Sequence, residues 1–367
     1  MQGTNRHCTT AVAKLPFVRQ PLLLMLLAAA AGGCGSPSPS PAPAPSGGRV
    51  TVTRTHDTMG TRIQLTASTA DAPEAERAFA DVFADFDRLD GMLSVWKPDS
   101  EIVRLNAAAG QAPVPVSAET REVLRIARQV SEWTDGAFDV TFGALTGLWK
   151  FDAQDKDGSV PTPAAVAARL PLVDYRALVI DDAAGTAFLQ KPGMKVHLGG
   201  IGKGYAVDRA TAILRSHGLR DFMIQAGGDL YVGGFKDGRP WKLGIRDPRG
   251  PADQVFATLE LTDGTFSTSG DYERFFMKDG RRYHHILDLS TGQPARLSRS
   301  VTIVTNKAVI ADALAKGVFV LGPVRGLALV ERLPDVEAVI VGAGSDVVVS
   351  SGLRGTVAVA ARPTDVP

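Results

Sequence analysis

Residues 35–48 cannot contribute to a folded core, and they divide the chain into two parts. They consist only of Gly, Ser, Pro and Ala, with no bulky apolar residue. Because proline fixes the backbone and favours extended conformations, such a stretch behaves as a semi-rigid spacer. We therefore expect folded sequence to begin at residue 49 and a separate leader to precede residue 34.

The leader, residues 1–33, has the features of a signal peptide. Basic residues Arg6, Lys14 and Arg19 precede a short apolar run that starts at Leu22 and is about half as long as a membrane-spanning helix. The run ends just before Cys34, which resembles a bacterial lipobox. On this interpretation Cys34 is lipidated, residues 34–48 tether the protein, and the protein lies on the periplasmic side of a bacterial membrane. The alternative is an ordinary signal peptide with an incidental cysteine.

Charge and cysteine content exclude some classes of protein. The 367 residues carry a formal net charge of +1, whereas a nucleic-acid-binding surface normally brings a strong basic excess. The two cysteines, Cys8 and Cys34, both precede the folded part. A disulfide framework or a cysteine metal site is therefore excluded there.

Apolar periodicity predicts more strands than helices. Alternating residues at 50–53 and 62–66 flank the turn at 58–61 and indicate a hairpin. Helical spacing predicts helices at 75–89, 117–133, 206–214, 308–319 and 324–332. Further strands are expected at 194–198, between 222 and 304, and at 336–341 and 346–350. Because strands and helices do not alternate regularly, we expect one α+β unit over residues 49–363.

A glycine-rich segment, Gly199-Gly200-Ile201-Gly202-Lys203-Gly204, joins a predicted strand to a predicted helix. Backbone N–H groups at a helix N-terminus favour an anion, and Lys203 adds positive charge. The segment is not a Walker A motif, because Gly204 follows the lysine, and its glycine spacing does not fit the dinucleotide fingerprint. Phosphate binding and a tight turn without a ligand both remain open.

Other short motifs occur in order between residues 54 and 332. They are Asp57-Thr58-Met59-Gly60-Thr61, Ser94-Val95-Trp96, Asp99-Ser100-Glu101, Leu105-Asn106, Thr134-Asp135-Gly136-Ala137-Phe138-Asp139, Tyr205-Ala206-Val207-Asp208, Gln225-Ala226-Gly227-Gly228-Asp229, Trp241 to Pro248, Ser269 to Arg274, His285-Ile286-Leu287-Asp288, Thr291-Gly292 and Ala311-Asp312-Ala313-Leu314-Ala315. Together with the glycine-rich segment, they resemble the ApbE family of FAD:protein FMN transferases.

The resemblance implies a single domain of mixed, mostly antiparallel sheets with flanking helices. It also implies a reaction in which a Thr or Ser hydroxyl of a target flavoprotein attacks FAD, so that FMN is retained as a phosphoester and AMP leaves. A divalent cation, usually Mg²⁺, would neutralise charge on the pyrophosphate.

The resemblance also assigns residues to roles. The expected FAD contacts are Met59, Trp96, Ala137, Phe138, Asp139, Gly199, Lys203, Tyr205 and Ile286. The expected metal-binding positions are Gly202, Asp312, Ala315 and Lys316. Taken singly, Trp96 and Phe138 could equally be packing residues, and Asp312 a surface acid.

His285 is the predicted general base, because an imidazole titrates near neutral pH and can accept the proton of an attacking hydroxyl. Its neighbour His284 would point to the opposite face if this segment is a strand. The alternative is that either histidine is structural.

Lys316 departs from the family pattern, in which Thr is usual at this position. On a helix, Asp312 and Lys316 lie one turn apart and can pair. We hypothesise that Lys316 replaces part of the metal's charge or shifts the metal towards the pyrophosphate. The alternative is that Lys316 points to solvent and the metal loses one ligand.

Two further functions are compatible with the sequence. One is a metal-dependent FAD pyrophosphatase, in which water replaces the protein hydroxyl. The other is a non-catalytic periplasmic flavin-binding lipoprotein.

Overall fold

The computed structural model describes residues 48–151 and 158–366. The predicted signal peptide, the lipidation site at Cys34 and all but the last residue of the spacer lie outside the described residues.

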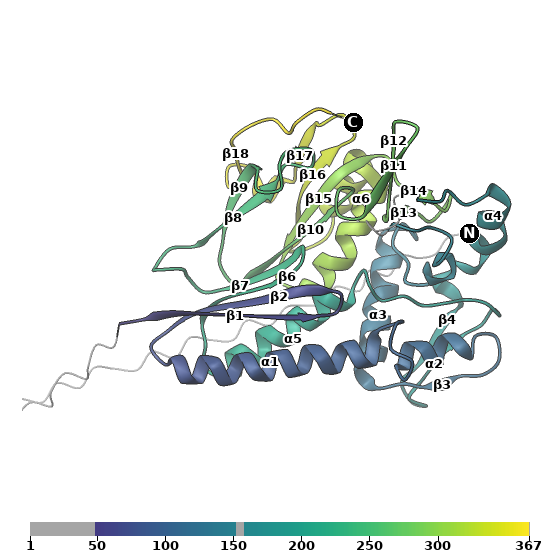
Figure 1. Ribbon diagram of the computed structural model, residues 1–367, viewed down its shortest axis with the longest axis horizontal. Helices are drawn as coiled ribbons and strands as arrows, with labels where there is room; N and C mark the ends of the chain where they lie inside the picture. Colours follow the sequence, from purple (N-terminus) through teal and green to yellow (C-terminus); the bar gives the residue numbers. More distant parts are fainter. Residues whose placement is uncertain (1–47, 152–157, 367) are drawn as a thin grey trace, which may run out of the picture. The chain divides into compact units, whose positions relative to one another are not determined.

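The main sheet has eight strands, and each strand is antiparallel to its neighbours (Figure 1). Across the sheet the strands are β1 (Val50–Thr58), β2 (Thr61–Thr69), β6 (Asp221–Ala226), β7 (Asp229–Gly233), β10 (Gly264–Gly270), β15 (Ser298–Thr305), β16 (Glu337–Gly342) and β17 (Val347–Val349). At one edge, Met59 and Gly60 form the two-residue turn between β1 and β2, with φ values of 50° and 69°. Positive φ at both positions suits the twist of a hairpin.

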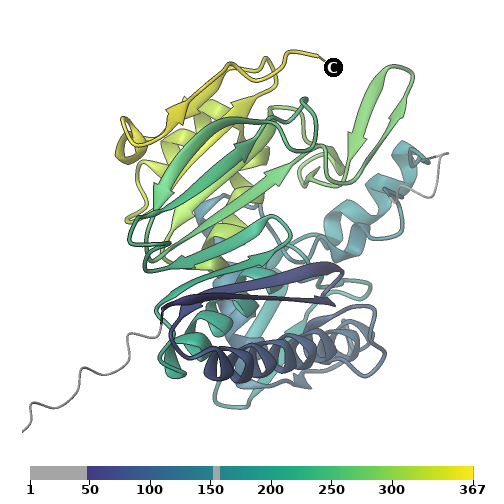
Figure 2. The ribbon, with the colours of Figure 1, turned by 60° about the vertical axis from the view of Figure 1, so that its left-hand side comes forward.

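Four helices build the core on one face of this sheet (Figures 1 and 2). They are α1 (Ala72–Leu93), α3 (Ala118–Trp133), α5 (Gly202–Ser216) and α6 (Ala308–Val330). Helix α6 packs against β10, β15 and β16, and α5 lies between α6 and α1. By length and composition α6 is the one helix in the described part of the chain that could cross a membrane, but most of it is buried in this core.

The opposite face of the sheet is covered by β8 (Trp241–Arg246), β9 (Val255–Leu261) and β18 (Ala358–Val359). Strand β15 is therefore buried at every position. Its residues Val301 and Ile303 face the helical core, whereas Val304 faces the second core. Both faces of β15 are therefore covered by other elements.

Smaller elements complete the fold. They are β3 (Val114–Pro115), β4 (Leu178–Asp181) and β5 (Thr186–Leu189) in a three-stranded sheet, the hairpins β11 (Phe275–Lys278) with β12 (Arg281–His284) and β13 (Leu287–Asp288) with β14 (Gln293–Pro294), and the short helices α2 (Glu101–Ala107) and α4 (Pro163–Arg169). The hairpin β11–β12 extends beyond the main sheet in Figure 2. It leads directly to His285.

The α+β class and the mostly antiparallel sheets are confirmed. The predicted helices at 308–319 and 324–332 are joined in α6, with a kink where Gly322 has a φ of 74° and Pro323 follows. The predicted strand at 194–198 is wrong: within the described residues it makes only an isolated bridge between Phe142 and Lys195.

Candidate active site

The N-terminus of α5 touches α6 without an intervening side chain. A Cβ atom on Gly204 would lie 2.3 Å from the carbonyl oxygen of Ala308 and 2.7 Å from the Cβ of Asp312. The absence of a side chain therefore allows the two helices to meet, and Gly204 donates its N–H to Oδ2 of Asp312 at 3.0 Å. One turn later, Asp208 accepts the N–H groups of Ala308 and Val309 and so caps α6.

A cluster of charges around two buried carboxylates lies at this helix junction. Lys203 forms ion pairs with Asp229 at 3.1 Å and with Asp312 at 3.9 Å. Lys316, one turn along α6, forms an ion pair with Oδ1 of Asp312 and donates to its backbone carbonyl at 2.8 Å. Ser267 also donates to Asp229. Asp229 lies in one of the sequence motifs, but the sequence predicted no role for it.

Each charge in the cluster is maintained by its partners. Burial disfavours the ammonium of Lys203, but the charges of Asp229 and Asp312 outweigh burial and hold the pKa of Lys203 above its ordinary value. Burial likewise disfavours the carboxylate of Asp312, but Lys203 and Lys316 keep the pKa of Asp312 below its ordinary value. Lys203 and Asp312 are therefore both charged at neutral pH.

His285 follows β12 and adjoins this cluster. Its backbone N–H donates to the carbonyl of Arg274, and its Nδ1 is buried without a hydrogen-bond partner among the described residues. Burial, followed by the positive charge of neighbours that include Lys316 and Arg274, lowers the pKa of His285 to about 3. The imidazole is therefore neutral at physiological pH and has a lone pair available.

The neighbouring His284 has a structural environment. Its Nε2 contacts the carbonyl oxygen of Ala295 at 2.8 Å, and its ring meets the edge of Phe319 with centroids 5.5 Å apart. The two adjacent histidines thus have different surroundings, and the charges of Lys316 and Arg274 act on the pKa of His285.

Two residues near the cluster, Arg274 and His197, were not predicted from the sequence. Arg274 is exposed and makes no side-chain hydrogen bond or ion pair with the rest of the described chain, yet its charge acts on Lys203, His197 and His285. His197 accepts the N–H of Gly199 at 3.0 Å. Arg274 ended a quoted motif and His197 preceded the glycine-rich segment, but only the fold places them beside the cluster.

Phe138 joins the motif around residue 137 to the cluster. A Cβ on Gly200 would lie 3.4 Å from the ring of Phe138, and a Cβ on Gly317 would lie 3.3 Å from its Cβ. The buried ring thus packs between the glycine-rich segment and α6. The predicted contact Phe138 therefore lies on the same glycine as the stem of Lys316, and Ala137 immediately precedes it.

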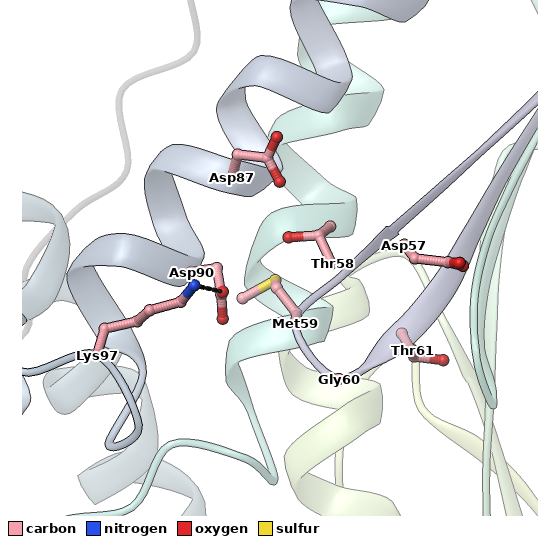
Figure 3. A pocket seen from close by; sticks show the side chains of 8 residues that line it. All are labelled: Asp57, Thr58, Met59, Gly60, Thr61, Asp87, Asp90 and Lys97. Atoms are coloured by element: carbon pink, nitrogen blue, oxygen red, sulfur yellow. Dashed lines mark ion pairs between the residues drawn. The ribbon is translucent and has the colours of Figure 1, made fainter.

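Met59 connects the β1–β2 turn to the same region. It lines an open pocket of about 620 Å³ together with Asp57, Thr58, Gly60, Thr61, Asp87, Asp90 and Lys97 (Figure 3). The Cε of Met59 lies 3.9 Å from where a Cβ of Gly202 would be. Beside this pocket, Trp96 precedes Lys97 and is 81% exposed. An exposed indole next to a pocket offers a stacking surface for an aromatic ligand.

The remaining predicted FAD contacts differ in how their side chains are used. The hydroxyl of Tyr205 donates to Glu122 at 3.1 Å, towards α3. The carboxylate of Asp139 accepts from Thr141 and from the N–H of Tyr175, and burial raises its pKa to about 6. Both side chains thus hold segments of the fold together, whereas Gly199 is exposed and Ile286 is buried.

The predicted metal positions do not offer a ready cation site. Asp312 is fully buried, and each of its carboxylate oxygens already faces a protein donor. Ala315 is buried in α6, and Gly202 begins α5. Within residues 48–151 and 158–366, no three His, Cys, Asp or Glu side chains are grouped as metal ligands. A cation would have to displace the ammonium of Lys316 to reach Oδ1 of Asp312.

Comparison with known proteins identifies the family. The model of the ApbE family matches residues 59–340. The chain belongs to the ApbE family. It is 33% identical over 297 residues to the FAD:protein FMN transferase of Klebsiella pneumoniae, covering 81% of this chain and 90% of that protein. It is 35% identical over 299 residues to that of Treponema pallidum, covering 77% and 82%.

Solved structures of the family have the same fold. The ApbE protein of Thermotoga maritima superposes with a TM-score of 0.76 and 34% identity, covering 84% of this chain and 99% of that one. The flavin transferase ApbE of Vibrio cholerae superposes with a TM-score of 0.75 and 30% identity, with the same coverage.

Proposed function

We propose that this protein is an FAD:protein FMN transferase. A Thr or Ser hydroxyl of a target flavoprotein attacks the FMN-side phosphorus of FAD. A new P–O bond forms to the target, the pyrophosphate bond breaks, and AMP leaves. Membership of the ApbE family supports this function. So do two relatives that carry this name and that the chain matches along most of their length.

The observation that carries the proposal at the site is the position of His285 beside unmatched positive charge. Lys203, Lys316 and Arg274 bring three positive charges, and Asp229 and Asp312 bring two negative ones. The excess of positive charge suits a pyrophosphate. It would stabilise most strongly the negative charge that develops on the phosphate oxygens during transfer. Neutral His285 has the lone pair needed to take the hydroxyl proton.

Flavin recognition is assigned to the pocket around Met59 and to Trp96. The pocket lies next to the N-terminus of α5, and Trp96 leaves an indole face open. The arrangement supports a path on which the flavin ring stacks near Trp96 while the phosphates reach the glycine-rich segment. The backbone of residues 137–139 and Gly199 would complete the contacts.

The predicted Mg²⁺ is given no step in this proposal. The carboxylate of Asp312 is engaged by Gly204 and Lys316, so the residues present do not fit a cation without rearrangement. A Mg²⁺ requirement stays a prediction of the family resemblance.

Mass spectrometry of a target tests the function. A candidate flavoprotein is incubated with the full-length protein in detergent and FAD, with and without Mg²⁺. We expect a mass gain equal to FMN on a Thr or Ser, together with AMP. His285→Ala should abolish the gain, whereas His217→Ala should keep it, because His217 pairs with Glu74 and Asp81 on the surface of α1. FMN and AMP without target modification would replace the proposal with FAD hydrolysis. Retained FAD without turnover would replace it with a binding role.

We also propose that the protein is an exported lipoprotein on the periplasmic side of a bacterial membrane. The support is the apolar leader, Cys34 and the Pro-rich spacer. Incorporation of labelled palmitate into the wild type and its loss in Cys34→Ser would support the anchor. Unchanged labelling in Cys34→Ser would contradict it.

A further inference from the structure

The contact between Lys316 and Asp312 joins a partly exposed lysine to a fully buried carboxylate. The side chain of Lys316 is 22% exposed and that of Asp312 is 0% exposed. The ammonium donates both to Oδ1 of Asp312 and to the backbone carbonyl of the same residue. It is therefore held by two acceptors, which a solvent-directed lysine would not be.

The other oxygen of Asp312 is engaged as well. Oδ2 accepts the N–H of Gly204 at 3.0 Å and lies 3.9 Å from the ammonium of Lys203. The carboxylate is thus neutralised from two sides. A Mg²⁺ ion needs an oxygen at about 2.0–2.1 Å with near-octahedral geometry, so an ammonium bonded to that oxygen would occupy its position.

The stem of Lys316 is positioned by packing. A Cβ atom on Gly200 would lie 3.3 Å from the Cδ of Lys316 and 3.5 Å from its Cε. The stem therefore lies across the glycine-rich segment at a place where a larger residue would crowd it. Phe138 lies against the same glycine. This packing restricts the lysine to the site and opposes its rotation into solvent.

We propose that the ammonium of Lys316 is a built-in cation, which takes the place of a divalent metal ion at Asp312. An ammonium has three donors, and two of them are used on Asp312, so one remains for a phosphate oxygen. Arg274, exposed and unpaired within the described chain, supplies a further charge. The proposed function enters only in naming the pyrophosphate of FAD as the anion.

Binding of Mn²⁺, a probe that reports directly on an occupied metal site, tests this inference. Free Mn²⁺ is followed by electron paramagnetic resonance while it is added to the full-length protein, with and without FAD. We expect weak binding to the wild type and an affinity at least about tenfold higher in Lys316→Thr, because a repelling unit charge is removed beside the ligand. The double variant Lys316→Thr/Asp312→Asn should lose that gain.

Two further variants make the result interpretable. Lys316→Met keeps the apolar stem on Gly200 but removes the charge, so it should also gain Mn²⁺ affinity if the threonine variant fails to fold. Lys307→Thr removes an exposed lysine from the start of the same helix and should bind Mn²⁺ like the wild type.

The affinity for FAD is a second measurable quantity, and it does not depend on turnover. Flavin fluorescence should give the same affinity for the wild type in EDTA and in Mg²⁺, whereas Lys316→Thr should require Mg²⁺. Tight, Asp312-dependent Mn²⁺ binding by the wild type would overturn the inference, as would unchanged Mn²⁺ affinity in both Lys316 variants. If the metal results hold but no target gains FMN, the proposed function fails and the inference stands.

Discussion

The side-chain amide of Asn106 forms two hydrogen bonds with the backbone of Val196. Its Nδ2 donates to the carbonyl of Val196 at 2.9 Å, and its Oδ1 accepts the N–H of Val196 at 2.7 Å. The amide thereby substitutes for a neighbouring strand just before the glycine-rich segment. A residue from α2 thus fixes the approach to the N-terminus of α5 without lying at the site itself.

Replacing Asn106 by Ala should therefore lower the stability of the fold. Loss of both bonds leaves a buried N–H and carbonyl of Val196 unpaired, and we expect a cost of about 1–3 kcal/mol in the free energy of unfolding. Urea denaturation measures this cost. Asn106→Asp keeps the acceptor but not the donor, so its urea midpoint should lie between those of the wild type and Asn106→Ala. An unchanged midpoint in Asn106→Ala would show that water replaces the amide.

Two Gly→Ala substitutions should change stability in opposite directions. In Gly204→Ala the new Cβ would meet the backbone carbonyl of Ala308 at 2.3 Å, so α5 and α6 must separate. We expect a loss of about 1–3 kcal/mol in the free energy of unfolding. A Cβ on Gly91, in α1, would have no neighbour within 4 Å in the described part of the chain, so Gly91→Ala should gain about 0.5–1 kcal/mol. Thermal denaturation of the pair compares them, and equal shifts would refute the close contact of the helices.

Removal of Arg274 should weaken FAD binding. A charge-assisted hydrogen bond to a phosphate contributes about 1.5–3 kcal/mol, so we expect Arg274→Ala to lower FAD affinity by about tenfold to a hundredfold. Arg274→Lys should retain part of the affinity. The control is Arg281→Ala, because Arg281 lies over the ring of Tyr283 on the β11–β12 hairpin, with 4.6 Å to the centroid. Fluorescence titration measures all three, and equal affinities for Arg274→Ala and Arg281→Ala would exclude the phosphate contact.

The low pKa of His285 should make stability depend on pH. The folded pKa is about 3 and the ordinary value is 6.5, so between these values the unfolded chain binds a proton that the folded chain does not. The contribution of neutral His285 to stability is therefore fully present above about pH 6.5. It is lost as pH decreases towards 3, by at most about 1.4 kcal/mol per pH unit for one proton.

His285→Gln removes this contribution. We expect its urea midpoint to fall less steeply with decreasing pH than that of the wild type. His56→Gln, which removes a histidine paired with Asp87 on α1, controls for loss of an imidazole as such. Parallel pH profiles for wild type and His285→Gln would show that His285 is not shielded from protonation.

Much of the fold could be predicted from local patterns. The helices around Phe79, Val123 and Val207 show apolar spacing that tertiary contacts reinforce, so periodicity found them. For the segment before Gly199, the same patterns predicted a strand, and this prediction was wrong. Its apolar residues resemble a strand, but the side chain of Asn106 replaces the neighbouring strand that a sheet would require.

The site could be predicted only in part. Motifs marked His285, Asp312 and Lys203 because each lies in a recognisable local sequence. The pairing of Lys203 with Asp229 and the action of Arg274 on His285 depend on tertiary contacts between distant strands and helices. The i,i+4 spacing did predict the ion pair between Asp312 and Lys316, because helix geometry is local.

The neutral imidazole of His285 also bears on the timing of the reaction. Burial, and after it the nearby positive charge, lowers its pKa and makes it a poor proton acceptor in the absence of a ligand. An arriving phosphate offsets Lys316 and Arg274 and stabilises the protonated ring, so the base strengthens as the site fills. We therefore expect His285 to be a weaker base towards water in the empty site than towards a hydroxyl when the anion is bound.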